Sequence, residues 1–237
     1  MRNTKKLLSA LACLALLLSL TGAALAEVTI TEERILQALD TVHIDYRYPT
    51  FATGDAALTS ALDALITESF LTRYGGLVDE QEAYTAGHPE DLAARYADPE
   101  VYDEISSTYE VLTNGDLLQI TQTYSFRRWN SNGTSDQVAA YCIDTATGRR
   151  LDPADFFAED ENTVYARLRV LFAEKVAAID YYWEEAHAAF AADTPFYYDA
   201  QADALCFLFD PYVLTAGAGG IQTVMIPVAE TGLTFIR

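Results

Sequence analysis

The chain has 237 residues, which allows one domain of ordinary size or two small ones. Hydrophobic residues make up 51% of it and charged residues 21%, a balance that excludes a disordered chain. With 15 basic and 35 acidic residues the net charge is −20. This charge argues against nucleic acid as a partner, because phosphate contacts require a cationic face. Three cysteines are too few for a small fold built on disulfides.

The first 26 residues have the parts of a secretory signal peptide. Arg2, Lys5 and Lys6 precede an apolar run from Leu7 to Leu20, and the segment ends in Ala24-Leu25-Ala26. The alternative is an uncleaved anchor, because an apolar stretch of about 20 residues could span a membrane. We expect cleavage after the A-x-A triplet, and therefore a secreted, extracytoplasmic chain with no membrane span once the signal is removed.

Removal of residues 1–26 leaves 12 basic and 35 acidic residues, so the mature net charge is −23. Such a charge keeps a secreted protein soluble and attracts basic partners over long range. Cys142 and Cys206 remain in the mature chain, each in a predicted strand. The compartment permits a bridge, but cysteine in mid-strand is more often a small buried residue, so we expect two free thiols.

Residues 27–100 are predicted to form an N-terminal part made of strands and a helix. Val28–Ile30 is short and alternating, and we interpret it as a strand or a lead-in to one. Alternation is clearer over Val42–Tyr48, and Pro49 should end that strand because proline cannot donate to the ladder.

A helix is predicted to follow Asp55, which is a favourable cap. Apolar residues recur at helical spacing from Leu58 to Phe70, and Gly75-Gly76 should end the helix. The polar stretch 77–100 is interpreted as a loop with a short helix over 91–96.

A three-stranded meander is predicted at the start of the C-terminal part, residues 101–237. A strand near 107–112 leads into Asn114-Gly115, a favoured two-residue hairpin turn, and Leu117–Phe126 returns. After the polar loop Arg127–Asp136, the chain should form a third strand up to Ile143. Strands that meander in this way are antiparallel.

The longest helix is predicted next, and three short strands after it. Acidic residues at 159–161 suit a helix N-terminus, an apolar stripe runs from Val164 to Phe190, and Thr194-Pro195 closes the helix. The strands, with a glycine-rich loop before the last, are expected at 196–198, Ala204–Phe209 and Val224–Val228. Helices and antiparallel strands in separate blocks predict one α+β domain over 27–237, with two main helices packed on antiparallel sheets.

The sequence contains no recognisable catalytic, metal-binding or cofactor-binding pattern. His43, His88 and His187 lack a second histidine at the spacing of a zinc motif, and no G-x-S-x-G elbow occurs. We therefore expect no metal and no cofactor. A hydrolase with two paired carboxylates stays a third hypothesis, since the sequence cannot give the distance between two acids.

Aromatic residues suggest a recognition surface. The runs Tyr181-Tyr182-Trp183 and Phe196-Tyr197-Tyr198 cannot all face inward, given helix and strand geometry. Exposed tyrosine and tryptophan stack on sugars or anchor protein interfaces. The alternative is that these tyrosines are merely half-buried.

Several short motifs follow the order of one domain family. They are Ile44–Pro49, Ser107–Val111, Thr147–Leu151, Asp155–Phe157, Thr194–Tyr198, Phe209–Tyr212 and Ile226-Pro227. In this order the chain resembles the extracytoplasmic domain of RsiV-type anti-sigma factors, which sense lysozyme. Similar domains precede the catalytic part of PdaC-type peptidoglycan deacetylases.

The resemblance implies an α+β domain outside the membrane that binds a basic protein such as lysozyme, or a cell-wall glycan, without catalysis. Two departures are Ser131–Ser135, where the family often has G-G-A-H, and Leu214–Gly217, where it tends to have Pro-Tyr. We assign binding to the loops around these positions. The candidate binding residues are Arg128, Trp129, Asn130, Asn132, Asp210, Pro211, Tyr212, Gly217 and Gly219.

Overall fold

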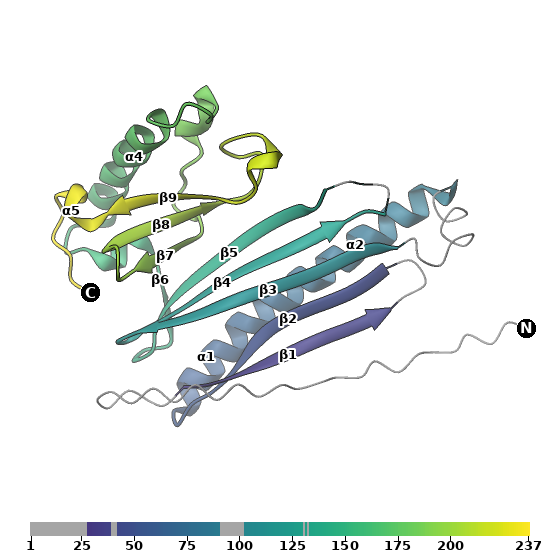
Figure 1. Ribbon diagram of the computed structural model, residues 1–237. Helices are drawn as coiled ribbons and strands as arrows, with labels where there is room; N and C mark the ends of the chain where they lie inside the picture. Colours follow the sequence, from purple (N-terminus) through teal and green to yellow (C-terminus); the bar gives the residue numbers. More distant parts are fainter. Residues whose placement is uncertain (1–27, 39–41, 91–101, 130, 132) are drawn as a thin grey trace, which may run out of the picture. The chain divides into compact units, whose positions relative to one another are not determined.

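The computed structural model describes residues 28–38, 42–90, 102–129, 131 and 133–237 (Figure 1). Within these residues the strands form a six-stranded sheet, in the order β1-β2-β3-β4-β5-β6, and a three-stranded sheet, β7-β8-β9. Helices accompany both sheets, so the predicted α+β class is confirmed. The described residues divide into two compact units, which are 28–108 with Ser125–Thr134, and Tyr109–Tyr124 with Ser135–Arg237.

The first unit begins with a long antiparallel pair. Strand β1 (Thr29–Ala38) pairs with β2 (Val42–Ala52), from Thr29 beside Ala52 to Ala38 beside His43. The prediction that Pro49 ends β2 was wrong. Amides two residues apart point to the same side of a strand, and the N–H of Arg47 faces β3, where it donates to Ser107 Oγ at 2.8 Å. The pairing of β2 with β3 ends at Asp45, so Pro49 removes no ladder bond.

Strands β2 and β3 (Asp103–Asn114) are parallel, with Val42 beside Asp103. The expected antiparallel arrangement therefore does not hold throughout the six-stranded sheet, which is mixed. The physical reason is the helical segment between the two strands, because a long crossover returns the chain to the end of the sheet from which it started.

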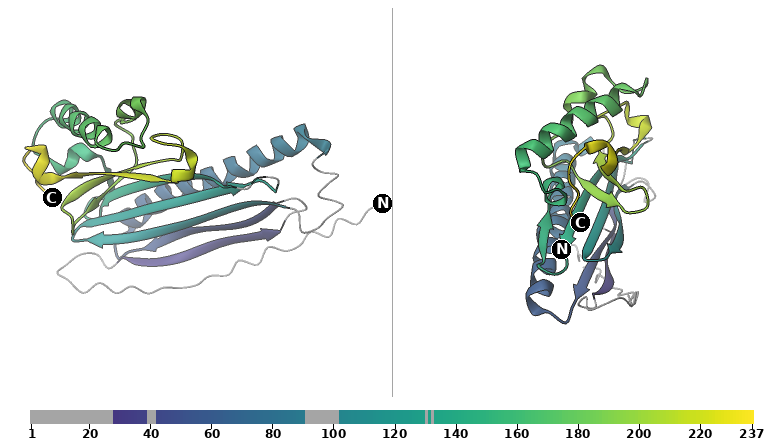
Figure 2. Two further views of the ribbon diagram at one scale, coloured as in Figure 1. Left: turned by 45° about the horizontal axis from the view of Figure 1, so that its top comes forward. Right: turned by 90° about the vertical axis from the view of Figure 1, so that its left-hand side faces the viewer.

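That crossover is one continuous helical segment, made of α1 (Ala56–Ile66), the π-helical η1 (Thr67–Leu71) and α2 (Thr72–Gly87). Asp55 caps it as predicted, accepting from the amides of Ala57 and Leu58 at 2.7 and 3.2 Å. The buried side of the segment packs on β2, where Tyr46 donates a hydrogen bond of 2.7 Å to the carbonyl oxygen of Phe70. The views in Figure 2 show the segment running along one face of these strands.

The predicted stop at Gly75-Gly76 and the predicted loop from residue 77 were wrong, because α2 continues to Gly87. A glycine costs a helix about 1 kcal/mol and blocks nothing, so the interactions of later residues can outweigh it. One of these residues is Gln81, which is buried and donates a hydrogen bond to the carboxylate of Asp103. The short helix expected over 91–96 lies outside the described residues.

The predicted meander is confirmed. Strand β3 is joined to β4 (Leu117–Arg127) by Gly115 and Asp116, with Gly115 at φ +60°. Strand β5 (Ser135–Asp144) follows and pairs with the short β6 (Arg149–Leu151) across the turn at 145–148.

Helix α4 (Glu161–Ala177) is shorter than predicted. It is preceded by the 3-10 turn η2 (Pro153–Phe156), and a second 3-10 turn, η3 (Glu184–Ala188), follows after a break. The helix does not extend to residue 190 because backbone groups near Trp183 bond elsewhere: its N–H donates to the carbonyl oxygen of Leu214 at 2.9 Å. The continuous segment 56–87, not α4, is the longest helical stretch among the described residues.

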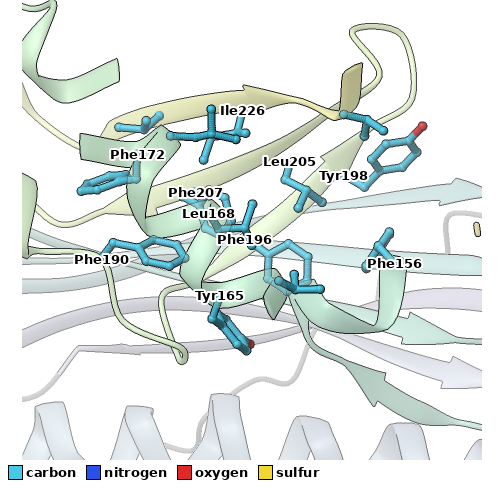
Figure 3. Close-up of a cluster of buried hydrophobic side chains, with 14 of the residues drawn as sticks. Phe156, Tyr165, Leu168, Phe172, Phe190, Phe196, Tyr198, Leu205, Phe207 and Ile226 are labelled. Carbon is cyan, nitrogen blue, oxygen red and sulfur yellow. The ribbon is translucent and has the colours of Figure 1, made fainter. Parts of the chain in front are cut away.

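The three-stranded sheet consists of β7 (Phe196–Asp199), β8 (Ala204–Phe209) and β9 (Gln222–Pro227), all antiparallel. The 3-10 turn η4 (Gly217–Gly219) precedes β9, and the short α5 (Val228–Thr231) follows it. Helix α4 packs on one face of this sheet. Figure 3 shows the aromatic core between them, in which Phe172 of α4 packs on Phe190, and Phe190 packs on Phe207 of β8.

Cys142 and Cys206 are both free and buried, as predicted. Burial raises the pKa of the Cys142 thiol to about 12, and it also raises the pKa of Cys206. Neither thiol is therefore ionised near neutral pH, so neither has the character of a reactive cysteine. In the part of the chain that is described, no helix is long and apolar enough to cross a membrane.

Candidate functional site

The segment from Asp210 to Gly220 is a structured loop of the second unit. The carboxylate of Asp210 accepts the backbone N–H of Val138 at 2.7 Å, which fixes the start of the loop to β5. Pro211 is half-buried, and Tyr212 follows with a positive φ of 69° and a side chain that is 69% exposed. The loop therefore presents one large aromatic ring to solvent from an anchored base.

Two glycines shape this loop. A Cβ built on Gly217 would lie 2.0 Å from Cζ of Tyr212, so the Tyr212 ring lies directly over Gly217. A Cβ on Gly219 would lie 2.7 Å from Cγ2 of Thr215. The side-chain amide of Gln222 also donates to the carbonyl oxygen of Gly219. Gly217 and Gly219 thus position the loop, and Tyr212 is the predicted residue that faces outward most.

A second segment, residues 181–183, lies beside this loop. Besides the bond from Trp183 to Leu214, Thr215 Oγ1 donates to the carbonyl oxygen of Tyr181 at 3.0 Å. Tyr182 is half-buried and donates to Gln222 Oε1 at 3.2 Å. We name the exposed large hydrophobic residues of the two segments the aromatic surface, which consists of Tyr181, Trp183, Tyr212 and Val213.

The charged residues of the chain segment that carries the aromatic surface have one sign. Residues 176–236 contain no lysine and no arginine. They contain the acidic residues Asp180, Glu184, Glu185, Asp193, Asp199, Asp203, Asp210 and Glu230. The first three of these are exposed and lie within three residues of Tyr181 or Trp183. The aromatic surface is therefore rimmed by carboxylates.

The other predicted loop belongs to the first unit, and its described residues are anchored locally. The guanidinium of Arg128 lies 3.6 Å from the centre of the Tyr84 ring, in cation–π geometry. The N–H of Trp129 donates to Asp103 Oδ1 at 2.8 Å, and the Trp129 side chain is half-buried. Asn130 and Asn132 lie outside the described residues. Arg128 and Trp129 thus pack against their own unit, and the structure assigns the two predicted loops to different units.

The second unit also has a polar cavity of about 800 Å³. Its acidic residues include Asp155, which receives two hydrogen bonds from Arg149 at 2.8 and 2.9 Å, and Glu159, which accepts from the N–H of Thr234 at 3.0 Å. Burial raises the pKa of Asp155. The hydrogen bonds from Arg149 and from the Asp152 amide lower it by more than burial raises it, so the net shift is downward. The pKa of Glu159 is also lowered, against burial, by the Thr234 amide. A general acid at neutral pH requires the opposite shift.

The described residues contain no group of three or more His, Cys, Asp or Glu side chains placed to hold a metal ion. His43 stacks on Tyr102 with ring centres 3.5 Å apart, and His88 stacks on Tyr84 at 4.0 Å. His187 is exposed, and its Nδ1 lies 2.7 Å from the carbonyl oxygen of Glu184.

The fold of this chain is similar to that of two solved structures. A DUF3298 family member from Bacteroides fragilis matches with a TM-score of 0.55 and 19% identity, over 97% of this chain and 95% of that chain. A DUF3298 family protein from Pseudomonas aeruginosa matches with a TM-score of 0.51 and 11% identity, over 90% and 97% of the respective chains. The chain has the fold of DUF3298 family proteins. No family model and no curated protein sequence matches it.

The likeness to DUF3298 structures concerns the fold alone, because identities of 19% and 11% do not transfer a ligand to the Asp210–Gly220 segment of this chain. The segment includes Leu214–Gly217, where the sequence departs from the Pro-Tyr pair of RsiV-type domains. In this chain Leu214 and Thr215 bond the 181–183 segment instead. Sequence reasoning noticed Tyr181 and Trp183 as exposed aromatics but could not place them beside Tyr212, because that neighbourhood depends on hydrogen bonds between distant segments.

Proposed function

We propose that this protein is a secreted, non-enzymatic binding protein of the bacterial envelope that recognises a basic protein such as lysozyme through the aromatic surface. The observation that carries the proposal is the aromatic surface itself, with its rim of carboxylates in a stretch that has no lysine or arginine. The signal peptide pattern, the resemblance to RsiV-type domains and the shared DUF3298 fold support the same proposal.

Such an interface would have two parts, an aromatic centre and a charged rim. Tyrosine and tryptophan supply large buried area at low cost in side-chain entropy, and they are the residues most often found at the centre of interfaces. Carboxylates at the rim speed the encounter with a basic partner and are screened by salt. The partner should therefore associate quickly at low ionic strength and be held by contacts with Tyr181, Trp183 and Tyr212.

The test is a binding measurement with the mature chain and a basic lysozyme, made by biolayer interferometry at low and raised salt. Tyr212→Ala should weaken binding by about 2 kcal/mol, or roughly 30-fold, if Tyr212 is a central contact. The matched control is Leu112→Ala, which truncates a side chain that is 50% exposed on β3 in the same unit. If lysozyme binds at neither salt concentration, it is not the partner. If Tyr212→Ala and Leu112→Ala lose the same affinity, the aromatic surface is not the binding site.

A cell-wall glycan is the second candidate ligand, and the exposure of Tyr181 and Trp183 is the observation that favours it, since both rings could stack on sugars. Tyr182 is held by Gln222 and is not part of this expectation. Glycan binding predicts co-sedimentation with purified peptidoglycan that survives raised salt and is lost after Tyr181→Ala or Trp183→Ala. Retention that disappears with salt alone would point to charge rather than to stacking.

A further inference from the structure

The three-stranded sheet has two edges, and hydrogen bonds show which backbone groups face each of them. The N–H of Leu208 donates to the carbonyl oxygen of Pro195 at 2.8 Å, so the even-numbered residues of β8 bond toward β7. The odd-numbered residues, Leu205 and Phe207, therefore bond toward β9. This parity decides which residues of the two outer strands point away from the sheet.

The β7 edge is closed by side chains. Phe196 and Tyr198 are the residues whose backbone groups point away from β8. The amide of Gln119 accepts the N–H of Tyr198 at 2.6 Å and donates to its carbonyl oxygen at 3.0 Å. The thiol of Cys142 donates to the carbonyl oxygen of Phe196 at 3.7 Å. Strands β4 and β5 of the same unit thus cap this edge.

The β9 edge is open. Ile226 pairs with Leu205 and Val224 with Phe207, so the backbone groups of Thr223 and Met225 point outward. In the described part of the chain, these outward groups have no hydrogen-bond partner. Their side chains are exposed as well, with Met225 at 43%. An extended chain could therefore form regular ladder bonds with both residues.

Proteins usually protect a free edge with charges, proline or a bulge, because an unprotected edge pairs with other chains. Strand β1, which is also an edge, carries Glu32, Glu33 and Arg34. Strand β9 carries no charge, and its proline, Pro227, stands at the last position. The β9 edge thus lacks the usual protection over Thr223 and Met225, where its outward groups lie.

The surrounding charge indicates what the edge accepts. A second copy of the chain would bring the same net charge of −23, which opposes pairing between copies. A cationic segment is attracted instead by the excess of acidic residues, since residues 176–236 contain eight carboxylates and no basic side chain. The two basic side chains of α4 that reach the residues after β9 are already engaged, Lys175 with Glu230 and Arg167 with the carbonyl oxygens of Glu230 and Thr231. The bond from Tyr182 to Gln222, the first residue of β9, makes this edge continuous with the segment that holds the aromatic surface.

We propose that the outer edge of β9 binds an extended segment of the partner protein that bears lysine or arginine, by adding it to the sheet as a fourth strand. The inference rests on the proposed function, in that the partner is a basic protein. It adds the mode of binding, in which main-chain hydrogen bonds to Thr223 and Met225 fix the segment and the aromatic surface contacts the rest of the partner.

The first experiment measures amide hydrogen exchange of the mature chain by NMR. The probes are a synthetic peptide of about eight alternating lysine and valine residues, long enough to span β9, and the matching glutamate–valine peptide. The lysine peptide should slow exchange at Thr223 and Met225 by about 10-fold or more, while Val224, already bonded to β8, changes little. The glutamate peptide should change neither. Unchanged exchange at Thr223 and Met225 with the lysine peptide overturns the proposal.

The second experiment compares Thr223→Pro, which removes one outward N–H, with the control Thr223→Val, which keeps it. The proline variant should bind both the lysine peptide and a basic lysozyme about 10-fold more weakly than the valine variant, as the loss of one ladder bond predicts. Slow exchange of Val224 in both variants verifies that the sheet is intact.

These measurements separate the two proposals. If lysozyme binds neither variant nor the unmodified chain, the proposed partner fails, while the peptide still tests the edge. If lysozyme binds both variants equally, the strand pairing is wrong and the proposed function stands. Self-association of the chain that Thr223→Pro abolishes, seen by sedimentation velocity, would make a second copy the occupant and overturn the proposal.

Discussion

Gln119 completes the edge of a sheet with a single side-chain amide. Its side chain is buried, and it both accepts from and donates to the backbone of Tyr198, as a neighbouring strand would. A buried backbone N–H or carbonyl that loses its partner costs about 1–3 kcal/mol. Gln119 therefore contributes to stability through the groups that it satisfies.

Gln119→Leu should lower the free energy of unfolding by about 2–4 kcal/mol, because leucine keeps the volume but leaves two backbone groups of Tyr198 without partners. Urea unfolding followed by circular dichroism measures this loss. The control is Gln201→Leu in the exposed turn between β7 and β8, which should change stability by less than about 0.5 kcal/mol. Similar losses for the two variants would contradict this account of Gln119.

Gly217 is constrained by the Tyr212 ring, which leaves no room for a side chain at this position. Gly217→Ala places a methyl group where the Tyr212 ring lies, so the ring must move away. Tyr212 is exposed, and we therefore expect stability to fall by less than about 1 kcal/mol while lysozyme affinity falls as in Tyr212→Ala. Gly54→Ala, at a glycine with nothing within 4 Å of the added carbon, is the control. Full binding by Gly217→Ala would show that the position of the ring is unimportant.

Asp45 links stability to pH. The hydrogen bond from Arg34, at 2.6 Å, lowers the pKa of Asp45 below its ordinary value of 3.8, with Arg47 adding to the effect. Because the folded-state pKa is the lower one, the stabilisation is present above about pH 4 and is lost as the pH falls through the folded-state value. Asp45→Asn should therefore destabilise the protein at neutral pH and make the loss of stability below pH 4 shallower. Denaturant unfolding at a series of pH values measures both effects, and parallel curves for the two proteins would contradict the prediction.

At the scale of elements, the helical segment 56–87 shows how packing overrides local preference. Gly75 and Gly76 lie inside α2, and a Cβ added to either meets nothing within 4 Å. The sequence alone favours a helix end there, and this was wrong because the sequence does not reveal the partners of later residues such as Gln81. The end of α4 was misplaced for a similar reason, since Leu214 takes the N–H of Trp183.

Gly75→Ala and Gly76→Ala should each raise the free energy of unfolding by about 0.5–1 kcal/mol, because alanine favours the helix and costs less backbone entropy. Thermal unfolding measured for both variants tests this. Gly115→Ala is the contrasting change, since Gly115 has a φ of +60° and alanine should destabilise the hairpin. Destabilisation by both helix variants would mean that α2 does not continue through these positions.

At the scale of the whole molecule, the predicted export of the chain would also change its net charge. If residues 1–26 are cleaved as the sequence predicts, three basic residues leave with them and the net charge changes from −20 to −23. Expression of the full chain in a secreting bacterial host should yield a product that begins at Glu27 and is found outside the cytoplasm. N-terminal sequencing and cell fractionation measure these two outcomes. A membrane-bound product that retains Leu7–Leu20 would favour the anchor instead.

The features that the sequence determined by itself are those that depend on residues close together in the chain. Alternation predicted the strands of the meander, and the apolar run Ala204–Phe209 predicted a strand of the three-stranded sheet. Asp55 and the acidic residues 159–161 predicted helix starts, and composition predicted the acidic charge. These features depend on propensity, capping and charge, which act over a few residues or on the whole composition. The α+β class followed from them, and Tyr212 was already among the candidate binding residues.

Only the tertiary structure decided which distant residues meet. It made β2 and β3 parallel, carried α2 through two glycines and joined the Tyr181–Trp183 segment to the loop that holds Tyr212. It also closed one edge of the three-stranded sheet with Gln119 and left the β9 edge open. Each of these outcomes rests on a hydrogen bond or a packing contact between residues far apart in the chain, and no local pattern specifies such a partner.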